Sequence, residues 1–187
     1  GSPAKNAKGG PRPPQLAKQL EPIDLLPADL DVVLRVDVAR LKAGLGPAFT
    51  EGLAARAAAQ GGDGFVAESM AKADTVWIGV RLADLDAGDR VLVAEGPLGE
   101  VHIEPSEWKE TTPAATMEGV RILDRQGIVA RASTGRIIVA SKRLYAFVSP
   151  AEVDATSRLL RNGPDEGRGD PAALGLVSVD VRGHRLP

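Results

Sequence analysis

The sequence GVRILDRQGIVARASTGRIIVAS, residues 119–141, decides the fold class. It contains three runs rich in Val and Ile, at 119–125, 127–133 and 135–141, with a glycine at each break between runs. We expect each run to be a β-strand, because β-branched residues favour strands. Gaps this short join antiparallel neighbours, since a parallel pair needs a crossover of a dozen or more residues. The stretch therefore predicts an antiparallel meander in the central sheet.

Apolar alternation extends the predicted sheet toward both ends of the chain. The segment LDVVLRVDV, residues 30–38, places apolar side chains at every second position. A period of two predicts a strand with one buried face, formed by Leu30, Val32, Leu34, Val36 and Val38. Further strands are expected at 74–82, 90–96 and 100–104, and a last strand within 173–183.

Two segments have the composition of helices. Residues 47–72 are rich in Ala and predict two helices, or one helix interrupted by the GGDG sequence at 61–64, that cover the sheet. Ser149-Pro150-Ala151-Glu152 has the spacing of a capping box and predicts a helix over 150–161. The fold class that follows is α+β: a largely antiparallel sheet of six to eight strands with two or three helices packed on one face.

The chain divides into a linker and a folded part. Gly1-Ser2 resembles the remnant of a cleaved expression tag, and residues 1–24 are rich in Pro, Gly and Lys. We expect this segment to be flexible, either as a tether between an anchor and the fold or as a disordered tail. A tag would mean that any natural signal peptide or lipid-bearing cysteine has been removed. Residues 25–187 are expected to form a single α+β domain.

Composition excludes several function classes. The net charge is −2, so no overall positive field attracts nucleic acid. The chain has no cysteine and two histidines, which excludes disulfides, thiolate metal sites and a multi-histidine site within one chain. No apolar run is long enough for a membrane span, so membrane contact is expected only through a lost N-terminal anchor. We predict no cofactor and no metal.

Two pairs of polar residues are candidate catalytic groups. His102 and Glu104 alternate on one expected strand and could form the acid–base pair of a hydrolase. Asp37 and Asp180 lie within strands and could form a carboxylate pair, with Arg35 and Arg182 as ion-pair partners. Exposed polar positions on amphipathic strands explain both pairs more simply.

Other catalytic and metal-binding patterns are missing. Asp84, Asp86 and Asp89 resemble a calcium loop, but Gly88 stands where the fifth-position ligand belongs, and turn formation explains these aspartates. The chain has neither a G-x-S-x-G elbow nor a nucleotide-binding glycine loop. We therefore predict no catalytic residue and favour a function that is not enzymatic.

The segment 104–118 is the strongest candidate for contact with a partner. It is expected to be an irregular acidic loop that carries Glu104, Glu107, Glu110 and Trp108. Irregular loops of about 15 residues are uncommon in compact domains and are often functional. An exposed Trp in such a loop would anchor a protein partner. The alternative is that Trp108 folds back over the sheet and the loop covers it.

A second hypothesis is a carrier of a small ligand or lipid. A curved sheet with helices on one face can enclose an apolar pocket. The hypothesis predicts a cavity lined by Val76, Ile78, Val91, Val93, Ile137 and Val139. Solid packing of these side chains would exclude it.

Two stretches resemble uncharacterised bacterial cell-envelope proteins, many of them predicted lipoproteins. They are LLPADLDVVLRVDVARL at 25–41 and AFVSPAEVDATSRLLRNG at 146–163, the latter followed by GLVSVDVRG at 175–183. The resemblance implies a secreted or lipid-anchored domain of the periplasm or cell envelope, with a cytoplasmic location as the alternative. Our leading hypothesis is a non-enzymatic binding or scaffolding module on a tether, with another envelope protein as its partner.

Overall fold

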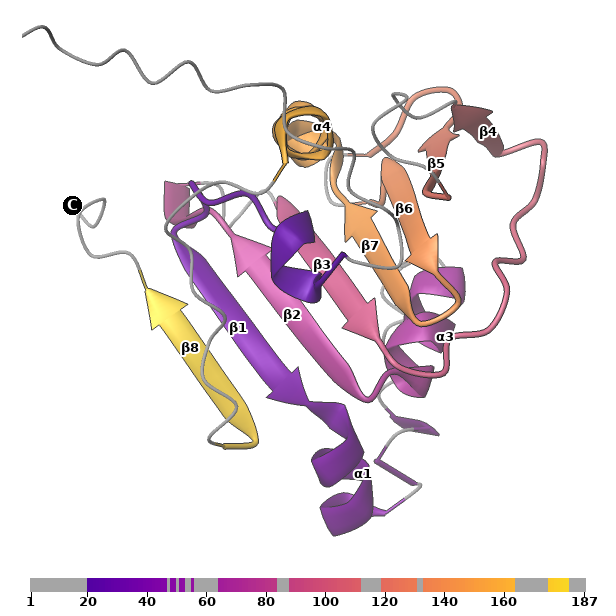
Figure 1. Cartoon of the computed structure of the whole chain (residues 1–187). Helices are drawn as coiled ribbons and strands as arrows, with labels where there is room; N and C mark the ends of the chain where they lie inside the picture. Colours follow the sequence, from indigo (N-terminus) through magenta and orange to yellow (C-terminus); the bar gives the residue numbers. More distant parts are fainter. Residues whose placement is uncertain are drawn as a thin grey trace, which may run out of the picture.

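The computed structural model describes residues 20–46, 48–49, 51–52, 55, 64–83, 88–111, 119–130, 133–163 and 175–181. Its described strands form one sheet in the order β4-β5-β6-β7-β3-β2-β1-β8 (Figure 1). The strands are β1 (Val32–Asp37), β2 (Thr75–Val80), β3 (Arg90–Glu95), β4 (Trp108–Thr111), β5 (Arg121–Arg125), β6 (Arg136–Ser141), β7 (Leu144–Val148) and β8 (Val177–Val181). Every pairing among them is antiparallel, which confirms the predicted α+β class.

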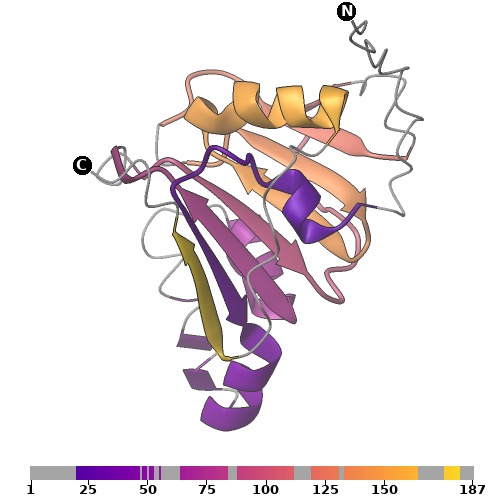
Figure 2. The same ribbon diagram turned by 60° about the vertical axis from the view of Figure 1, so that its left-hand side comes forward.

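Helices pack on both faces of the sheet, and the expectation of one covered face is wrong. The helical elements are η2 (Pro22–Leu25), α1 (Val38–Leu45), α3 (Gly64–Lys72), η4 (Pro150–Glu152) and α4 (Val153–Asn162). Figure 2 shows η2 and α4 on one side of the sheet and α3 on the other. Two separate apolar clusters result, one with Leu25 and Leu160, the other with Phe65 of α3. The central strands need both covers because apolar residues occupy both of their faces.

The most deeply buried strand, β7, was not predicted. All five residues of LYAFV are buried, with Ala146 in one cluster and Tyr145 and Phe147 in the other. The ring of Phe65 lies 6.0 Å from that of Tyr145 and 5.9 Å from that of Phe147. A strand buried on both faces has no alternation, so periodicity does not reveal it.

Two predicted strands are absent where they were expected. Residues 100–104 have an irregular backbone, and so do 128–130, where Ile128 is fully exposed. Residues 131–132 lie outside the described residues. The meander therefore runs from β5 to β6 through a longer connection, and then to β7 through the short turn at Lys142-Arg143.

Both faces of β1 contact apolar clusters, and not only the predicted face, whose Val36 and Val38 pack in the cluster on the α3 side. Val33 is fully buried, whereas Val32, Leu34 and Val36 are only half-buried. Leu30 precedes the strand and packs in the same cluster as Val33. A Cβ at Gly79 would lie 2.4 Å from Leu30 Cδ1, so a larger residue at this position of β2 would force the Leu30 side chain to move.

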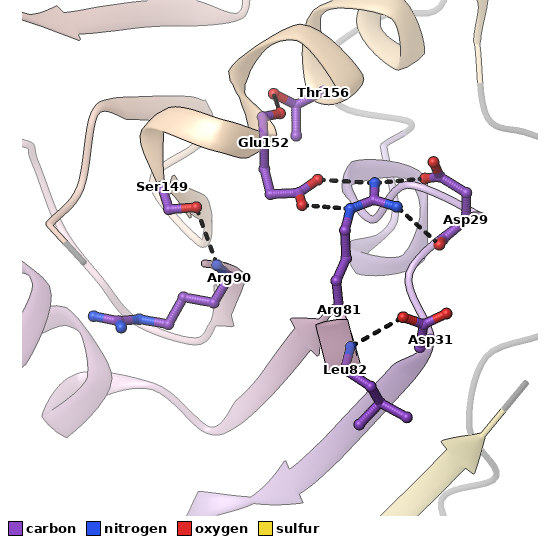
Figure 3. A network of polar contacts seen from close by, with 8 residues as sticks. All are labelled: Asp29, Asp31, Arg81, Leu82, Arg90, Ser149, Glu152 and Thr156. Atoms are coloured by element: carbon purple, nitrogen blue, oxygen red, sulfur yellow. Dashed lines mark hydrogen bonds and ion pairs between the residues drawn. The ribbon is translucent and has the colours of Figure 1, made fainter. Parts of the chain in front are cut away.

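The predicted helix at 150–161 is present as η4 and α4, but the capping box is not formed. The Ser149 hydroxyl accepts a hydrogen bond from the backbone N–H of Arg90 at 3.0 Å, and so links the helix start to β3 (Figure 3). The Glu152 carboxylate accepts from Arg81 Nε at 2.6 Å. Both side chains therefore fix the helix to the sheet and do not cap it.

Of the expected helical segment 47–72, α3 accounts for 64–72. Residues 48–49, 51–52 and 55 are also helical. Of the predicted break at 61–64, Gly64 begins α3 and residues 61–63 lie outside the described residues.

Candidate functional site

Strand β8, at one end of the sheet, has an inverted burial pattern. Val177, Val179 and Val181 are exposed by 52%, 55% and 49% respectively, whereas Ser178 and Asp180 between them are half-buried. A strand at a solvated surface normally presents its polar residues to water and its apolar residues to the core. We call the three exposed valines the valine edge.

The valine edge continues an apolar strip across the neighbouring strands. Val177, Val179 and Val181 lie opposite residues of β1 that share their face, in the pairs Val177–Val36, Val179–Leu34 and Val181–Val32. The same row continues into β2 at Val76, Ile78 and Val80. Exposure falls along it, from exposed in β8 through half-buried in β1 to buried at Val76. The apolar side chains of this strip are thus most exposed on the outer strand, β8.

The backbone of the valine edge faces outward. The N–H of Asp37 donates to the carbonyl of Leu176 at 2.9 Å, so the backbone groups of Leu176 point toward β1. Successive residues of an antiparallel strand direct these groups to alternate sides. The N–H and C=O groups of Val177, Val179 and Val181 therefore point away from β1, and β8 is the terminal strand of the described sheet. Each valine offers an exposed side chain and outward backbone groups.

The predicted carboxylate pair does not form. Asp180 lies opposite Val33. Asp37 lies at the far end of β1, where its side chain accepts from the backbone N–H of Arg40 at 2.9 Å and caps α1. Arg35 stacks over the Trp77 ring at 5.6 Å, and Arg182 lies outside the described residues.

At the opposite end of the sheet, Trp108 is buried, and the expectation of an exposed aromatic anchor is wrong. Its side chain is 7% exposed and packs in the cluster that contains Tyr145 and Phe147. The Arg125 guanidinium lies 5.5 Å from the centre of its ring. The segment expected to be an irregular loop contains β4, so Trp108 begins a strand and covers the sheet.

The three glutamates of this segment are exposed. Glu107 pairs with Arg125 at 3.6 Å, and Glu110 pairs with Arg121 at 2.9 Å. The hydrogen bond from Arg121 lowers the pKa of Glu110 below its ordinary value. Glu104 accepts from the Ser106 hydroxyl at 3.5 Å. Contact of these glutamates with a partner stays a prediction.

Asp124 of β5 ties the strands at this end together. It accepts from Thr111 Oγ1 at 2.8 Å and from Arg136 Nε at 2.6 Å. Burial alone would raise the pKa of Asp124, but the hydrogen bonds from Arg136 and Thr111 outweigh burial and lower it. Arg136 also donates to Ser157 of α4. Ion pairs and hydrogen bonds thus connect β4, β5, β6 and α4 at this end of the sheet.

His102 and Glu104 do not form a catalytic site. Both are exposed and lie in the irregular segment before β4, with no shared strand face. Asp89 is buried, and Asp84 and Asp86 lie outside the described residues. Among the residues that the structure describes, no group of three His, Asp or Glu side chains is arranged to hold a metal ion.

The residues predicted to line a carrier pocket do not share a face, so this prediction is wrong. Val91 and Val93 lie in the cluster beneath η2 and α4. Val76, Ile137 and Val139 lie in the cluster on the α3 side, and Ile78 packs against it. Alternation within β3 explains the split, because Leu92 and not Val91 is the neighbour of Ile78.

A polar network joins the start of α4 to the end of β2 (Figure 3). Arg81 bonds to Glu152 at 2.6 Å and to Asp29 at 3.0 Å. The hydrogen bond with Glu152 raises the pKa of Arg81 above its ordinary value, so the cation is permanent. A hollow of about 320 Å³ lies beside it, lined by Pro27, Asp29, Ala155, Arg158, Leu159 and Asn162. The network serves to hold the fold together.

Comparisons with known proteins identify a fold likeness and no family. No family model matches the chain, and no curated protein matches it. The crystal structure of form I of TP0453, a membrane-associated lipoprotein of Treponema pallidum, is similar with a TM-score of 0.50 and 12% identity. The match covers 78% of this chain and 53% of that one, so the chain spans about half the length of that structure. Form III of TP0453 matches with a TM-score of 0.44 and 11% identity, covering 78% and 54%.

Among the described residues, no helix has both the length and the apolar character that crossing a bilayer requires.

Proposed function

We propose that this chain is a non-enzymatic binding or scaffolding module of the cell envelope, and that it docks its partner through the valine edge. The partner is another envelope protein that contributes an extended strand. In this proposal the Pro- and Gly-rich segment that precedes Leu20 tethers the domain, because Leu20 and η2 already pack in the core, and nucleic acid is not a partner.

The observation that carries the proposal is the burial pattern of β8. Exposing three valines to water is unfavourable by roughly 25 cal/mol for each Å² of apolar surface. Exposed apolar surface together with outward backbone groups is the combination that strand addition uses. The backbone supplies hydrogen bonds, and alternate side chains supply specificity. Native sheets usually protect such an edge with charges, prolines or bulges, and the β8 sequence VSVDV carries only Asp180.

Support for the envelope comes from two sides. The sequence resembles predicted lipoproteins at 25–41 and 146–163. The fold is similar to that of TP0453, a membrane-associated lipoprotein. We carry that location over to this chain as part of the proposal.

The test is site-specific photo-crosslinking in the organism that encodes the protein. A photo-reactive amino acid is placed at Val179 on the valine edge, at Lys109 on β4, or at the exposed Asp154 of α4 as a control. We expect adducts from position 179, recovered in the envelope fraction, and only background from 154. Adducts from position 109 alone would move the binding surface to the acidic segment that contains Glu104, Glu107 and Glu110. Background at all three positions would contradict the proposal.

A further inference from the structure

We propose that the valine edge binds the valine edge of a second copy, so that two β8 strands pair antiparallel around a two-fold axis at Val179. This inference rests on the proposed function and takes the partner at the valine edge to be a second copy of this chain, and not a different envelope protein. Three features of β8 support it: the direction of its backbone groups, the placement of its single charge, and the contrast with β4.

The backbone geometry permits this pairing. A two-fold axis at Val179 sets Val179 opposite its own copy and Val177 opposite the copy's Val181. All of these residues direct their N–H and C=O groups away from β1, as the Asp37–Leu176 hydrogen bond requires. Each such pair exchanges two hydrogen bonds, so three pairs would supply about six. A shift by one residue would set backbone groups that point away from β1 opposite groups of the copy that point toward its own β1, and these hydrogen bonds would be lost.

The side chains favour the same register. All valines of both strands would lie on one face and extend the apolar strip of β1 across the axis. On the other face Asp180 would lie opposite Ser178 of the copy, so no carboxylate would face another. A shift by two residues in one direction would set the two Asp180 side chains opposite each other, which is unfavourable. The opposite shift would leave Val181 opposite Gly175. Only the register centred on Val179 pairs every valine and separates the charges.

The two edges of the sheet differ in a way that favours a closed pair. A β8 strand that paired with β4 of the next copy would build an open chain of molecules. Strand β4 has four residues, and Lys109 and Glu110 are exposed on it. It therefore offers β8 no row of valines. Pairing of β8 with itself uses the matching surface twice and closes at two copies.

Size measurement of the full chain tests the inference. We expect the 19.5 kDa chain to sediment as a monomer at low concentration and as a dimer at high concentration. Val179→Asp would bring two carboxylates face to face and should weaken the dimer at least tenfold. Val179→Ile should preserve it, as should Lys109→Glu at the other edge. Circular dichroism checks that each variant folds, and Val179 is exposed enough to tolerate the change.

Single cysteines test the register, because this 187-residue chain has none. Facing residues of a hydrogen-bonded pair have Cα atoms about 5.5 Å apart, within reach of a disulfide. Val179→Cys alone should oxidise to a covalent dimer. Val177→Cys alone should not, whereas a mixture of Val177→Cys and Val181→Cys chains should. Equal oxidation of all single variants would overturn the register.

The outcomes separate this inference from the proposed function. A chain that stays monomeric at every concentration, yet crosslinks from position 179 to a different envelope protein, overturns the inference and leaves the function intact. A dimer that Val179→Asp does not weaken also overturns the inference. Absence of crosslinks from position 179 contradicts the proposed function itself.

Discussion

The terminal strands of the sheet, β4 and β8, expose opposite kinds of side chain to water. Strand β4 is short, and its exposed residues are charged, while its one large apolar side chain, Trp108, is buried. Strand β8 exposes three valines and half-buries its polar residues. Figure 1 shows the two strands at opposite ends of the same sheet.

The difference teaches where an interaction surface can lie in this fold. Charged side chains and ion pairs, such as Glu110 with Arg121, discourage another strand from adding to β4. The valine edge has no comparable protection within β8 apart from Asp180. A binding function thus fits β8 better than β4, although the acidic, Trp-containing segment around β4 is the more conspicuous of the two in the sequence.

The largest expected effect on stability is at Trp108. We expect Trp108→Ala to lower the free energy of unfolding by about 3 kcal/mol, because it removes a buried indole and leaves a cavity. Chemical denaturation measures this loss. Self-association of the folded fraction should not change. A loss below about 1 kcal/mol would mean that Trp108 is not the structural residue of the β4 end.

Val179→Lys should have the opposite effects, with little change in stability and a large loss of association. Its side chain is about half exposed, so we expect the free energy of unfolding to change by less than about 1 kcal/mol. Association should weaken at least tenfold, because two ammonium groups would meet at the two-fold axis. Denaturation and sedimentation on the same sample separate the two effects. A large loss of stability would show that the valine edge belongs to the core.

The pH dependence of stability sharpens the description of the β4 end. The pKa of Asp124 is lowered in the folded state, so its ion pair with Arg136 stabilises the fold fully above the unfolded pKa of about 3.9. That contribution is lost as the pH falls from there through the lower, folded pKa. Asp124→Asn should flatten this part of the acid unfolding curve, measured by circular dichroism. An unchanged curve would contradict the role of Asp124.

The smallest stability effect should come from removing the charges of β4. Lys109 and Glu110 are exposed, and the Glu110–Arg121 pair is worth roughly 0.5 kcal/mol or less. We expect the double substitution Lys109→Val and Glu110→Val to leave thermal unfolding nearly unchanged but to cause concentration-dependent association. Light scattering measures it. A variant that stays as monodisperse as the natural chain would mean that these charges do not protect β4.

Much of the fold could be predicted from the sequence. Short breaks and β-branched runs predicted an antiparallel sheet, and β5 and β6 lie within the runs at 119–125 and 135–141. The spacing after Ser149 predicted α4, although the side chains of Ser149 and Glu152 bond to Arg90 and Arg81 and do not form the capping box. Local patterns predict helices because residues such as Ser and Pro favour a helix start, whichever hydrogen-bond partners the side chains have in the fold.

The proposed binding surface could not be predicted in the same way. Alternation in VSVDV identifies a strand, but it leaves open which of its faces is buried when both faces of a sheet carry apolar clusters. Only the pairing of β8 with β1, at the end of the sheet, exposes the valines. For a related reason the sequence did not decide whether Trp108 is exposed or buried. Its burial depends on β5, which supplies Arg125 above its ring.

Amide hydrogen exchange of β8, followed by NMR at two protein concentrations, tests the central claim most directly. In dilute solution the account predicts rapid exchange at Val177, Val179 and Val181 and slow exchange at Ser178 and Asp180, whose amides point toward β1. At high concentration the three valine amides should become protected as the second strand adds. Valine amides that are already protected in dilute solution, and equally protected at high concentration, would contradict the claim that this edge is open for docking.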